Sequence, residues 1–425
     1  MGSDELERSR IKIIRISSEC SECGIILLKA CFYSRHSDFV RRFGLLFMNF
    51  LTLNPENFGL DISDLSLKII KLKKKRRSLS LSSFGEKEIK PGVIKDGEIK
   101  DEKELAKIIK EAVGSVEGQK LKTKYVVASL PEEKSFLQVI QMPKISEQDL
   151  RSAIVYEAEN YIPLPVEDVY IDFQIISSPE KKSDRLNVLL AALPKKVVDP
   201  YLSCLKSAGL EPVVFETESL AITRVLVKEN EAPRPIFLID LGATNTKLIA
   251  SFGQNVRFAS SISVSGQNFT EAISRNLGVS FAEAENLKNK YGLGEGSKLE
   301  TIGAEINIQK KGKVKGKVFD ALVPVLVDLI QQIKKHLDYY QTHASQEYGI
   351  RSGNDVFNIL LCGGGANLSG LPELLSLELK IPVKVGSPWV NILSENQKEE
   401  SKLPLKKSLR YVTAMGLALR GIKNQ

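Results

Sequence analysis

Apolar positions along the chain follow two spacings, and each spacing predicts one type of element. Short apolar or alternating runs bounded by polar turns are typical of strands, and apolar residues three and four positions apart are typical of helices. The predicted strands are Phe58–Ile62, Tyr125–Leu130, Phe136–Met142, Val169–Ile176, Leu186–Leu193, Pro212–Phe215 and Val356–Cys362. The predicted helices are Glu102–Ala112, Ser146–Tyr161, Lys195–Ala208, Glu218–Lys228, Gly266–Leu277, Phe281–Tyr291, Phe319–Tyr348 and Val412–Arg420. This mixture of strands and helices predicts an α/β protein.

Three segments interrupt the pattern. Residues 1–57 show no sustained period, so we expect a poorly ordered arm, or extra sequence ahead of the fold. The segment Asn230–Pro235 contains two prolines and predicts a linker between two halves. A loop rich in glycine and lysine spans about Lys310–Gly316.

One hairpin pattern occurs twice, once near the start of each half. Each copy has an apolar strand that ends in an aspartate, then a turn, then a lysine seven positions after the aspartate. The two pairs are Asp61 with Lys68 and Asp240 with Lys247. A unit repeated at the starts of two halves indicates a duplicated domain. Taken alone, either copy is equally an ordinary β-hairpin with turn-forming residues.

The hairpins have the chemistry of phosphate sites. A tight turn exposes consecutive backbone N–H groups, which bind phosphate oxygens. The hydroxyls of Ser66, Thr244 and Thr246 can add hydrogen bonds. A carboxylate at the strand end, Asp61 or Asp240, can hold a hydrated Mg²⁺ ion, and the following lysine supplies positive charge to a β- or γ-phosphate.

A third candidate lies near the C-terminus, where the apolar run Ile359–Cys362 meets three glycines. Gly363, Gly364 and Gly365 let the backbone approach a flat ligand closely. The adenine or α-phosphate of a nucleotide fits this description. The motif lacks the spacing and position of a dinucleotide fingerprint, which disfavours that class.

Charge narrows the partners only in part. The net charge is +8 and the pI about 9.0, which suits nucleotide phosphates, anionic lipid or nucleic acid. The basic run Lys71–Arg77 has no interleaved aromatic residues, so we interpret it as a solvated hairpin tip and predict no nucleic-acid partner. No apolar stretch approaches the length of a membrane span, and the acidic start of the chain does not fit a signal peptide, so we expect a cytoplasmic protein.

The five cysteines form an odd, widely spaced set, which is a poor disulfide framework and favours a reducing compartment. Cys20 and Cys23 form a CxxC motif with Cys31 and His36 nearby. A zinc site is therefore a minor alternative to chance spacing.

The order of two aspartate hairpins and a glycine triplet resembles the actin, sugar-kinase and chaperone ATPase superfamily. Within it, three phrases are similar to the PilM family, relatives of the cell-division protein FtsA. These phrases are Tyr156–Pro163, Ile239–Thr246 and Tyr411–Arg420, and the resemblance covers about residues 58–425. It implies an actin-like ATPase fold with two duplicated RNase H-like domains, an FtsA-type inserted subdomain and a nucleotide cleft between the domains.

The resemblance also implies domain limits. Ahead of the fold lie residues 1–57. The first domain is placed at 58–232, with the inserted subdomain at about 136–210, and the second domain at 233–400. Residues 401–425 are expected to form a helix that returns to the first domain.

ATP and Mg²⁺ are the cofactors that the resemblance implies. Asp61 and Asp240 are the implied metal-binding residues, and Glu218 and Asp240 the candidates for catalysis near the γ-phosphate. The implied nucleotide-binding residues are Asp61, Ser63, Ser66, Lys68, Asp240, Gly242, Ala243, Thr244, Asn245, Thr246, Glu285, Lys288, Gly363, Gly364 and Gly365.

One position departs from the family pattern. The first hairpin has Asp61-Ile62-Ser63, where the family has Asp-x-Gly. Serine tolerates positive φ less well than glycine, so we expect a rebuilt turn with Asp64 as a candidate for the special conformation. The extra acid at Asp64 is also expected to repel phosphate unless a metal intervenes. Both effects predict weaker nucleotide binding at this hairpin.

The resemblance implies a scaffold of a type IV pilus or type II secretion machine at the inner membrane. Such a scaffold captures the cytoplasmic N-terminal peptide of a PilN-like membrane protein and hydrolyses ATP weakly at most. Tyr161, Ile162 and Pro163 are candidates for the peptide groove, although a buried helix end is the simpler interpretation. Contacts with pilus motor ATPases and self-association are further options.

Two other functions stay open. One is an FtsA-like filament or membrane-tether protein, and the other is a sugar-kinase-like phosphotransferase. Residues 421–425 are too few for the C-terminal membrane helix of FtsA, which favours recruitment to the membrane through a partner.

Overall fold

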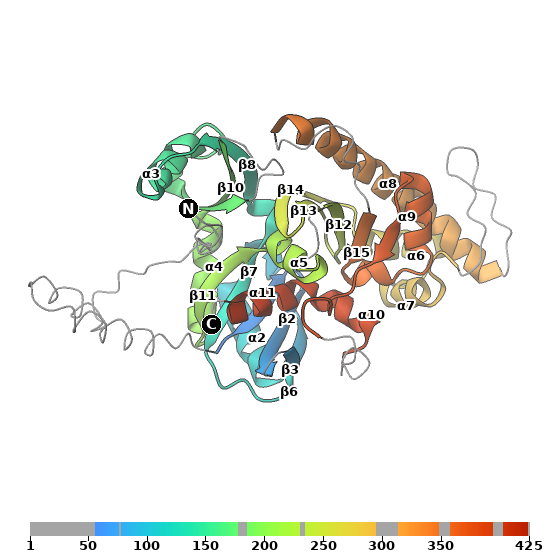
Figure 1. The fold of residues 1–425 in the computed structure, drawn as a ribbon. Helices are drawn as coiled ribbons and strands as arrows, with labels where there is room; N and C mark the ends of the chain where they lie inside the picture. Colours follow the sequence, from blue (N-terminus) through green and yellow to red (C-terminus); the bar gives the residue numbers. More distant parts are fainter. Residues whose placement is uncertain are drawn as a thin grey trace, which may run out of the picture.

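The computed structural model describes residues 56–75, 78–176, 185–229, 234–294, 313–347, 358–393 and 403–423 (Figure 1). Two large sheets dominate the fold. The first has the order β11 (Glu211–Thr217), β7 (Tyr125–Leu130), β1 (Phe58–Ser63), β2 (Ser66–Lys75), β3 (Ser78–Glu88) and β6 (Glu117–Gly118). The second has the order β16 (Val383–Val385), β15 (Asn358–Cys362), β12 (Pro235–Leu241), β13 (Thr246–Phe252) and β14 (Asn255–Ile262).

The two sheets repeat one arrangement. In each, three antiparallel strands form a meander, and two later strands join parallel to the first strand of that meander. The register repeats as well, because Asp61 pairs with Lys68 across β1 and β2, and Asp240 pairs with Lys247 across β12 and β13. The repeated hairpin in the sequence therefore corresponds to a repeated sheet.

A smaller sheet is inserted between β7 and α4 (Lys195–Ser207). It has the order β8 (Phe136–Pro143), β10 (Arg185–Pro194) and β9 (Val169–Ile176), and it carries α3 (Glu147–Ala158). Ser146 caps α3 by accepting a hydrogen bond from the N–H of Asp149. Ile140, Ile154 and Val188 help to form a separate apolar core for this sheet. The side chains of α4 belong instead to the main core, so the separate core ends with β10.

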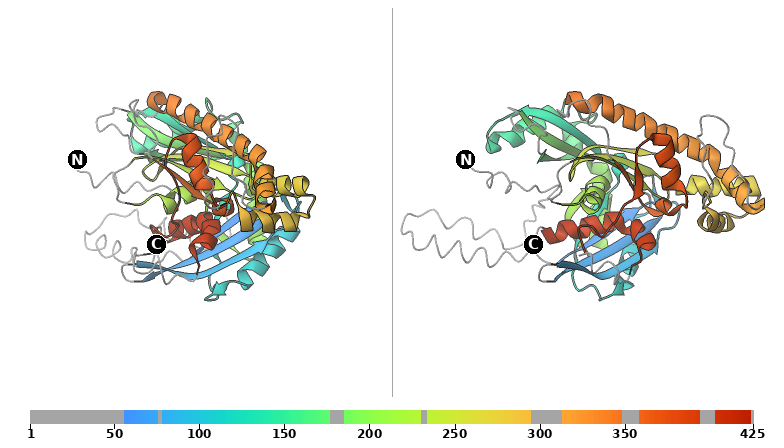
Figure 2. Two further views of the ribbon diagram at one scale, coloured as in Figure 1. Left: turned by 90° about the vertical axis from the view of Figure 1, so that its right-hand side faces the viewer. Right: turned by 45° about the vertical axis from the view of Figure 1, so that its right-hand side comes forward.

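Two helices lie between the large sheets and contact each other. They are α5 (Glu218–Leu226) and α11 (Val412–Lys423). Helix α5 contacts β13 and β14 of the second sheet, and α11 contacts β1, β2 and β7 of the first (Figure 2). These two helices therefore connect the halves beneath the hairpins.

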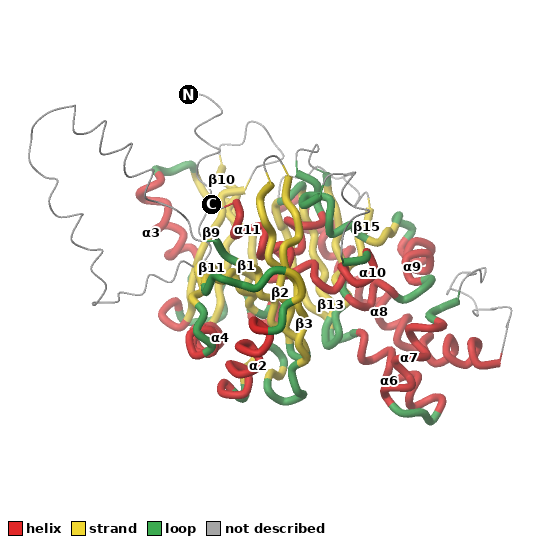
Figure 3. Tube along the Cα trace, turned by 90° about the horizontal axis from the view of Figure 1, so that it is seen from below, coloured by secondary structure: helices red, strands yellow, loops and turns green. Residues whose placement is uncertain are grey.

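The remaining helices are divided between the sheets. Helix α2 (Glu102–Gly114) packs with α4 on the first sheet. Helices α6 (Gly266–Leu277), α7 (Phe281–Tyr291), α8 (Lys313–Glu347) and α9 (Leu371–Leu379) belong to the second half. Figure 3 shows α6 and α7 at the end of the molecule opposite α3.

The predicted elements are found within a few residues of their expected limits, with one exception. Helix α8 begins at Lys313, so the second part of the expected loop Lys310–Gly316 is helical. The buried side chain of Val318 begins its apolar face, and a single glycine inside a long helix costs only about 1 kcal/mol. The basic residues Lys71–Lys75 form the last part of strand β2, next to the turn of the β2–β3 hairpin, and Lys73 and Lys74 are exposed as expected.

Several expectations fall outside the part of the chain that the structure describes. They are the arm up to residue 55 with Cys20, Cys23, Cys31 and His36, and residues 230–233 of the linker. Asn57, at the limit of the expected arm, is buried and donates a hydrogen bond from its side chain to the carbonyl of Gly421. In the described ranges, no helix combines the length and apolar character needed to cross a membrane.

Candidate functional site

Both hairpins and the glycine triplet open onto one cleft with a volume of about 920 Å³. A cavity of this size accommodates a ligand as large as a nucleotide. The predicted residues that line it are Asp61, Ser63, Ser66, Lys68, Glu218, Asp240, Gly242, Ala243, Thr244, Asn245, Glu285, Lys288, Gly363, Gly364 and Gly365. Residues predicted from separate parts of the sequence therefore surround one space.

The first hairpin places Asp61 at the end of β1, where it is almost fully buried. Its Oδ1 accepts a hydrogen bond from the Ser129 hydroxyl at 3.1 Å, and the same hydroxyl oxygen accepts one from the N–H of Ile62 at 2.9 Å. The Lys68 ammonium donates to the Ser66 hydroxyl at 2.7 Å and lies 3.9 Å from Asp61. Ser129 thus fixes the aspartate, while Lys68 extends along the floor of the cleft.

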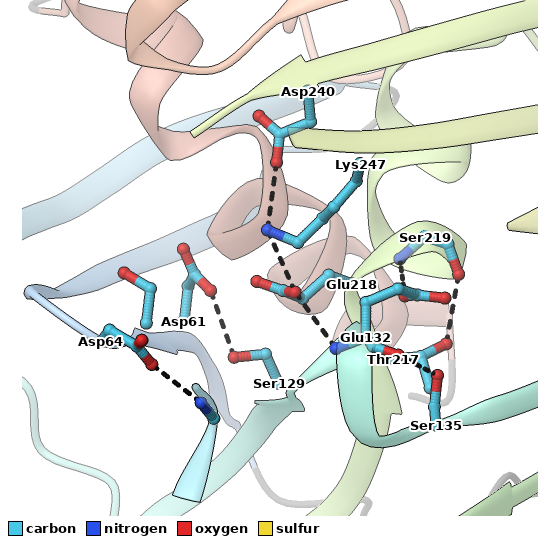
Figure 4. A network of polar contacts seen from close by, with 12 residues as sticks. Asp61, Asp64, Ser129, Glu132, Ser135, Thr217, Glu218, Ser219, Asp240 and Lys247 are labelled. Atoms are coloured by element: carbon cyan, nitrogen blue, oxygen red, sulfur yellow. Dashed lines mark hydrogen bonds and ion pairs between the residues drawn. The ribbon is translucent and has the colours of Figure 1, made fainter. Parts of the chain in front are cut away.

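The second hairpin places Asp240 at the end of β12, and its lysine is more tightly enclosed. The Nζ of Lys247 lies 3.1 Å from the carboxylate of Glu218 and 3.5 Å from that of Asp240 (Figure 4). All three side chains are buried. A buried cation between two carboxylates satisfies the requirement that buried charges be paired.

The loop between β7 and β8 joins this network. Its short helix η3 (Glu132–Lys134) carries the buried carboxylate of Glu132, which accepts from the N–H of Ser219 at 2.9 Å. In return, the N–H of Glu132 donates to Glu218 at 3.4 Å (Figure 4). The carboxylate of Glu132 lies at the N-terminus of α5, where negative charge is favoured. This reciprocal contact ties the loop that leads into the inserted sheet to the floor of the cleft.

The site contains more buried acids than buried bases. Burial raises the pKa of Glu218 well above its usual range, and burial likewise raises the pKa of Asp61 and of Glu132. Burial alone would lower the pKa of Lys247, but the nearby Glu218 and Asp240 raise it by more, so this lysine stays charged. The excess of acid favours a cation beside any phosphate in the cleft.

The turn of the first hairpin is not rebuilt in the way that the sequence predicted. Among the described residues, only Asp96 and Lys380 have positive φ without being glycine, so Ser63 and Asp64 both have ordinary φ. The Ser63 hydroxyl donates to the carbonyl of Ser66 at 2.9 Å, which stabilises the turn. Serine is tolerated here because the turn does not require a left-handed residue.

Asp64 does not point its charge freely at the cleft. Its carboxylate accepts hydrogen bonds from two backbone N–H groups, that of Asp96 at 2.9 Å and that of Gly97 at 3.0 Å. Hydrogen bonds from backbone N–H groups favour the charged form of a carboxylate, and the N–H dipoles offset part of its negative potential. The predicted repulsion of phosphate is therefore reduced.

The glycine triplet begins with a residue that only glycine suits. Gly363 has φ of 81°, and a side chain there would place its Cβ 2.4 Å from Oδ1 of Asp240. The other two glycines of the triplet begin the short helix η5 (Gly364–Asn367). The close approach joins the end of β15 to the catalytic candidate on β12.

Glu285 and Lys288 lie on one face of α7. The Lys288 ammonium pairs with Glu285 at 2.7 Å and donates to the carbonyl of Gly266 at 3.0 Å. The Thr270 hydroxyl also donates to Glu285. Both side chains are thus held against the first turn of α6 while they line the cleft.

Two groups of predicted residues lie elsewhere. The side chain of Thr246 is wholly buried, and its hydroxyl donates to the carbonyl of Val264 at 2.6 Å, so it stabilises the hairpin from inside. Tyr161 and Pro163 are exposed just after α3, whereas Ile162 is part of the core of the inserted sheet. The simpler interpretation, a buried helix end, therefore holds only for the burial of Ile162, and all three residues follow the end of α3 at Ala158.

The structure adds residues that the sequence did not assign to the site. Ser129 and Glu132 come from the end of β7 and the loop after it, and Lys247 was recognised in the repeat but not placed with Glu218. Because β7 lies parallel to β1, the polar residues around Pro131 end beside Asp61. A polar residue at the end of a predicted buried strand was the available signal.

The donor set suits a hydrated metal ion and not an all-protein metal site. Within the described ranges, no three side chains of His, Cys, Asp or Glu are placed together to hold a metal ion. Mg²⁺ in nucleotide sites is typically held by one or two carboxylates, waters and phosphates. Asp61 and Asp240, at the ends of the two central strands, fit that role.

Comparisons with known protein families and solved structures agree with this fold. Residues 59–422 match the family described as "Type IV pilus assembly protein PilM". A solved "PilM-PilN type IV pilus biogenesis complex" is similar with a TM-score of 0.69 and 27% identity, over 87% of this chain and 99% of that one. The cell division protein FtsA of Streptococcus pneumoniae is 25% identical over 357 residues, which are 78% of this chain and 75% of that protein. FtsA of Neisseria meningitidis is 23% identical over 52% of this chain and 54% of that protein. The predicted actin-like α/β fold is confirmed.

Proposed function

Because the chain belongs to the PilM family of type IV pilus assembly proteins, we propose that it is an ATP-binding scaffold of a pilus assembly platform. The observation that carries the nucleotide role is the single cleft bounded by two matching hairpins and the glycine triplet. Two hairpins that face each other offer backbone N–H groups to phosphates from both sides. The protein would act in the cytoplasm at the inner membrane.

The cleft residues divide into three roles in this proposal. The turns after Asp61 and Asp240 hold the phosphates, and these two carboxylates receive the waters of a bound Mg²⁺ ion, which supplies positive charge to the phosphates. Lys68 adds a positive charge at the first hairpin. The glycine triplet and the α7 side chains Glu285 and Lys288 face the nucleoside.

In this proposal, ATP hydrolysis is not the main function of the protein. We assign Glu218 and Asp240 to any reaction at the terminal phosphate, because both border the cleft. Lys247 already forms ion pairs with both carboxylates, which holds them away from an attacking water. Slow turnover with long nucleotide occupancy fits a scaffold better than a phosphotransferase.

The partner in this proposal is a PilN-like inner-membrane protein, because the similar solved structure is a PilM–PilN complex. Its cytoplasmic N-terminal peptide would contact the inserted sheet. Tyr161 lies three residues after the end of α3 and is 43% exposed, and Pro163 is also exposed. Tyrosine is enriched among the residues that contribute most to binding when a partner buries them.

The nucleotide role is tested by calorimetric titration of ATP with and without Mg²⁺. We expect Mg²⁺-dependent binding by the wild type, at least about ten-fold weaker binding by Asp240→Asn, and unchanged binding by Asp338→Asn. Asp338 is a matched control because it is exposed on α8, away from the cleft. Absence of binding by the wild type would reject the nucleotide role.

The partner role is tested with a fluorescent peptide copied from the cytoplasmic N-terminus of the PilN-like protein of the same organism. Tyr161→Ala is expected to weaken binding by about ten-fold, as for a buried aromatic anchor. Tyr339→Ala, a similarly exposed tyrosine on α8, is the control. Equal affinities of the two variants would place the peptide away from Tyr161.

A further inference from the structure

A two-residue turn projects into the cleft beside the first hairpin. It joins β4 (Ile94–Lys95) to β5 (Glu98–Ile99), and its Gly97 is one of the residues that line the cleft. Asp96 and Gly97 have φ of 52° and 74°, the left-handed values that such a hairpin turn requires. Asp96 is not glycine, so its conformation costs free energy that the surrounding contacts must offset.

Three contacts hold this turn in place. The Asp64 carboxylate accepts from the N–H groups of Asp96 and Gly97, and the Tyr201 hydroxyl donates to the carbonyl of Gly97 at 3.0 Å. Tyr201 is only 1% exposed. A Cβ on Gly97 would lie 2.6 Å from Pro131, so the turn also fits closely against the loop that follows β7.

The contacts form a chain from a distant helix to the phosphate turn. Tyr201 lies on α4, and Gly97 links it to Asp64, which directly follows the Ser63 turn of the first hairpin. The equivalent turn of the second hairpin is held in another way, by backbone N–H groups of α6. The turn of the first hairpin also accepts one backbone hydrogen bond, from the N–H of Ile89 to the carbonyl of Leu65 at 2.9 Å. Asp64 and Tyr201 add side-chain contacts that link this turn to elements outside its own strands.

We propose that Asp64 and Tyr201 are positioning residues, which act through the Asp96–Gly97 turn to hold the first hairpin in its phosphate-binding shape. Neither side chain needs to touch the nucleotide. This inference rests on the proposed function of the cleft as an ATP site. It gives the acid at Asp64, which the family pattern did not explain, a structural role beside a phosphate turn.

The proposal predicts a loss confined to the phosphates. Tyr201→Phe removes one hydrogen bond without changing the shape of the side chain. We expect MgATP and MgADP to bind about five-fold more weakly, the effect of one lost hydrogen bond, and adenosine to bind within about two-fold of wild type. Tyr170→Phe is the matched control, because the Tyr170 hydroxyl donates at 3.0 Å to Asp199, also on α4, but does not reach the turn.

The direction in which Asp64→Asn changes the affinity for MgATP gives a second test. If Asp64 acted only as a negative charge near the phosphates, its neutralisation would strengthen MgATP binding. If it positions the turn, the amide turns a donor toward one of the two N–H groups, and MgATP binding weakens by about five-fold or more while adenosine binding is unchanged. Stronger MgATP binding by Asp64→Asn would overturn the proposal.

Amide hydrogen exchange, measured without nucleotide, tests the positioning role independently of the proposed ATP site. Faster exchange at residues 58–66 and 94–99 in Tyr201→Phe than in Tyr170→Phe supports the positioning role, whether or not ATP binds. Equal exchange in both variants, together with wild-type affinity for MgATP, rejects the positioning role and leaves the ATP site intact. Failure of the wild type to bind ATP would reject the proposed function instead.

Discussion

The two phosphate hairpins share strands and register, yet they are fastened by different groups. At the second hairpin, the first turn of α6 donates backbone hydrogen bonds to the carbonyls of Gly242 at 2.9 Å and Ala243 at 3.0 Å. At the first hairpin, one backbone hydrogen bond, from the N–H of Ile89 to the carbonyl of Leu65, is joined by a side-chain contact, in which the carboxylate of Asp64 accepts from the Asp96–Gly97 turn. A backbone fastening survives most substitutions, whereas a side-chain fastening depends on one residue.

The polar contacts of the lysine and the aspartate also differ between the two hairpins. Lys247 is clamped between Glu218 and Asp240, while Lys68 has a serine hydroxyl as its nearest partner. Ser129 on β7 and Cys362 on β15 take equivalent places, each beside the aspartate of the neighbouring strand. Burial and Asp240 raise the pKa of the Cys362 thiol well above its usual range. Duplication has thus kept the backbone and changed the polar contacts.

The largest expected effect comes from Lys247→Met. It leaves Glu218 and Asp240 buried without a cation, so we expect the free energy of unfolding to fall by about 3–5 kcal/mol at pH 7, measured by urea unfolding. The loss should shrink at pH 5, because a carboxyl can take up a proton. Lys68→Met is the counterpart in the first half and should cost less, since its ammonium lies 3.9 Å from Asp61. Equal losses would show that the two lysines are equally clamped.

Ser129→Ala is expected to cost about 1–3 kcal/mol of unfolding free energy, because the buried N–H of Ile62 loses its acceptor. Cys362→Ala should cost less, since its backbone neighbours pair within the sheet. Thermal unfolding of the two variants side by side measures the difference. The reverse order would contradict the role given to Ser129.

Exchanging the turn residues tests whether the two hairpins tolerate the same side chain. A Cβ on Gly242 would lie 2.7 Å from the carbonyl oxygen of Asn245, so Gly242→Ser should weaken ATP binding by about ten-fold, or about 1.4 kcal/mol. Ser63→Gly should change it by less than about two-fold. Calorimetric titration decides, and a large effect of Ser63→Gly would show that the serine hydroxyl is needed.

The smallest expected effects are changes in the pH dependence of the free energy of unfolding. Burial raises the pKa of Glu132 in the folded state, so its contribution to stability is greatest below its unfolded pKa near 4.5 and is lost as the pH rises. Glu132→Gln should therefore remove a decline in unfolding free energy between pH 5 and 7. Urea unfolding across this range measures the slope, and an unchanged slope would contradict the raised pKa.

Glu98, beside the turn at the first hairpin, is predicted to behave in the opposite way. Hydrogen bonds from Lys100 and Lys134 lower its pKa from 4.5 to about 2. Its contribution is therefore present above pH 4.5 and lost as the pH falls toward 2. The difference in stability between wild type and Glu98→Gln should shrink from pH 5 to pH 3, and a difference that grows over this range would count against it.

The sequence predicted the hairpins because aspartate, turn and lysine recur at one spacing, and local chemistry determines their shape. It could not predict the partners of Lys247 or the reciprocal contact of Glu132 with α5, because these residues meet only when separate parts of the chain fold together. The sequence also could not predict that the side chain of Thr246 is buried, because alternation along a strand does not reveal which face is buried. The Ser63 turn was misjudged because neither Ser63 nor Gly242, its counterpart in the second hairpin, has positive φ; at Gly242 the constraint is space beside Asn245.

The inserted sheet leaves the first half after η3 and returns to it at α4, and both of these points contact the cleft. Glu132 in η3 meets Glu218, and Tyr201 in α4 meets the turn beside Asp64. A pull applied to the inserted sheet would therefore be transmitted to two places at the cleft: Glu218, which pairs with Lys247 of the second hairpin, and the turn that holds Asp64 of the first hairpin. Mechanically, the inserted sheet is connected at both of its ends to residues that hold the two phosphate hairpins.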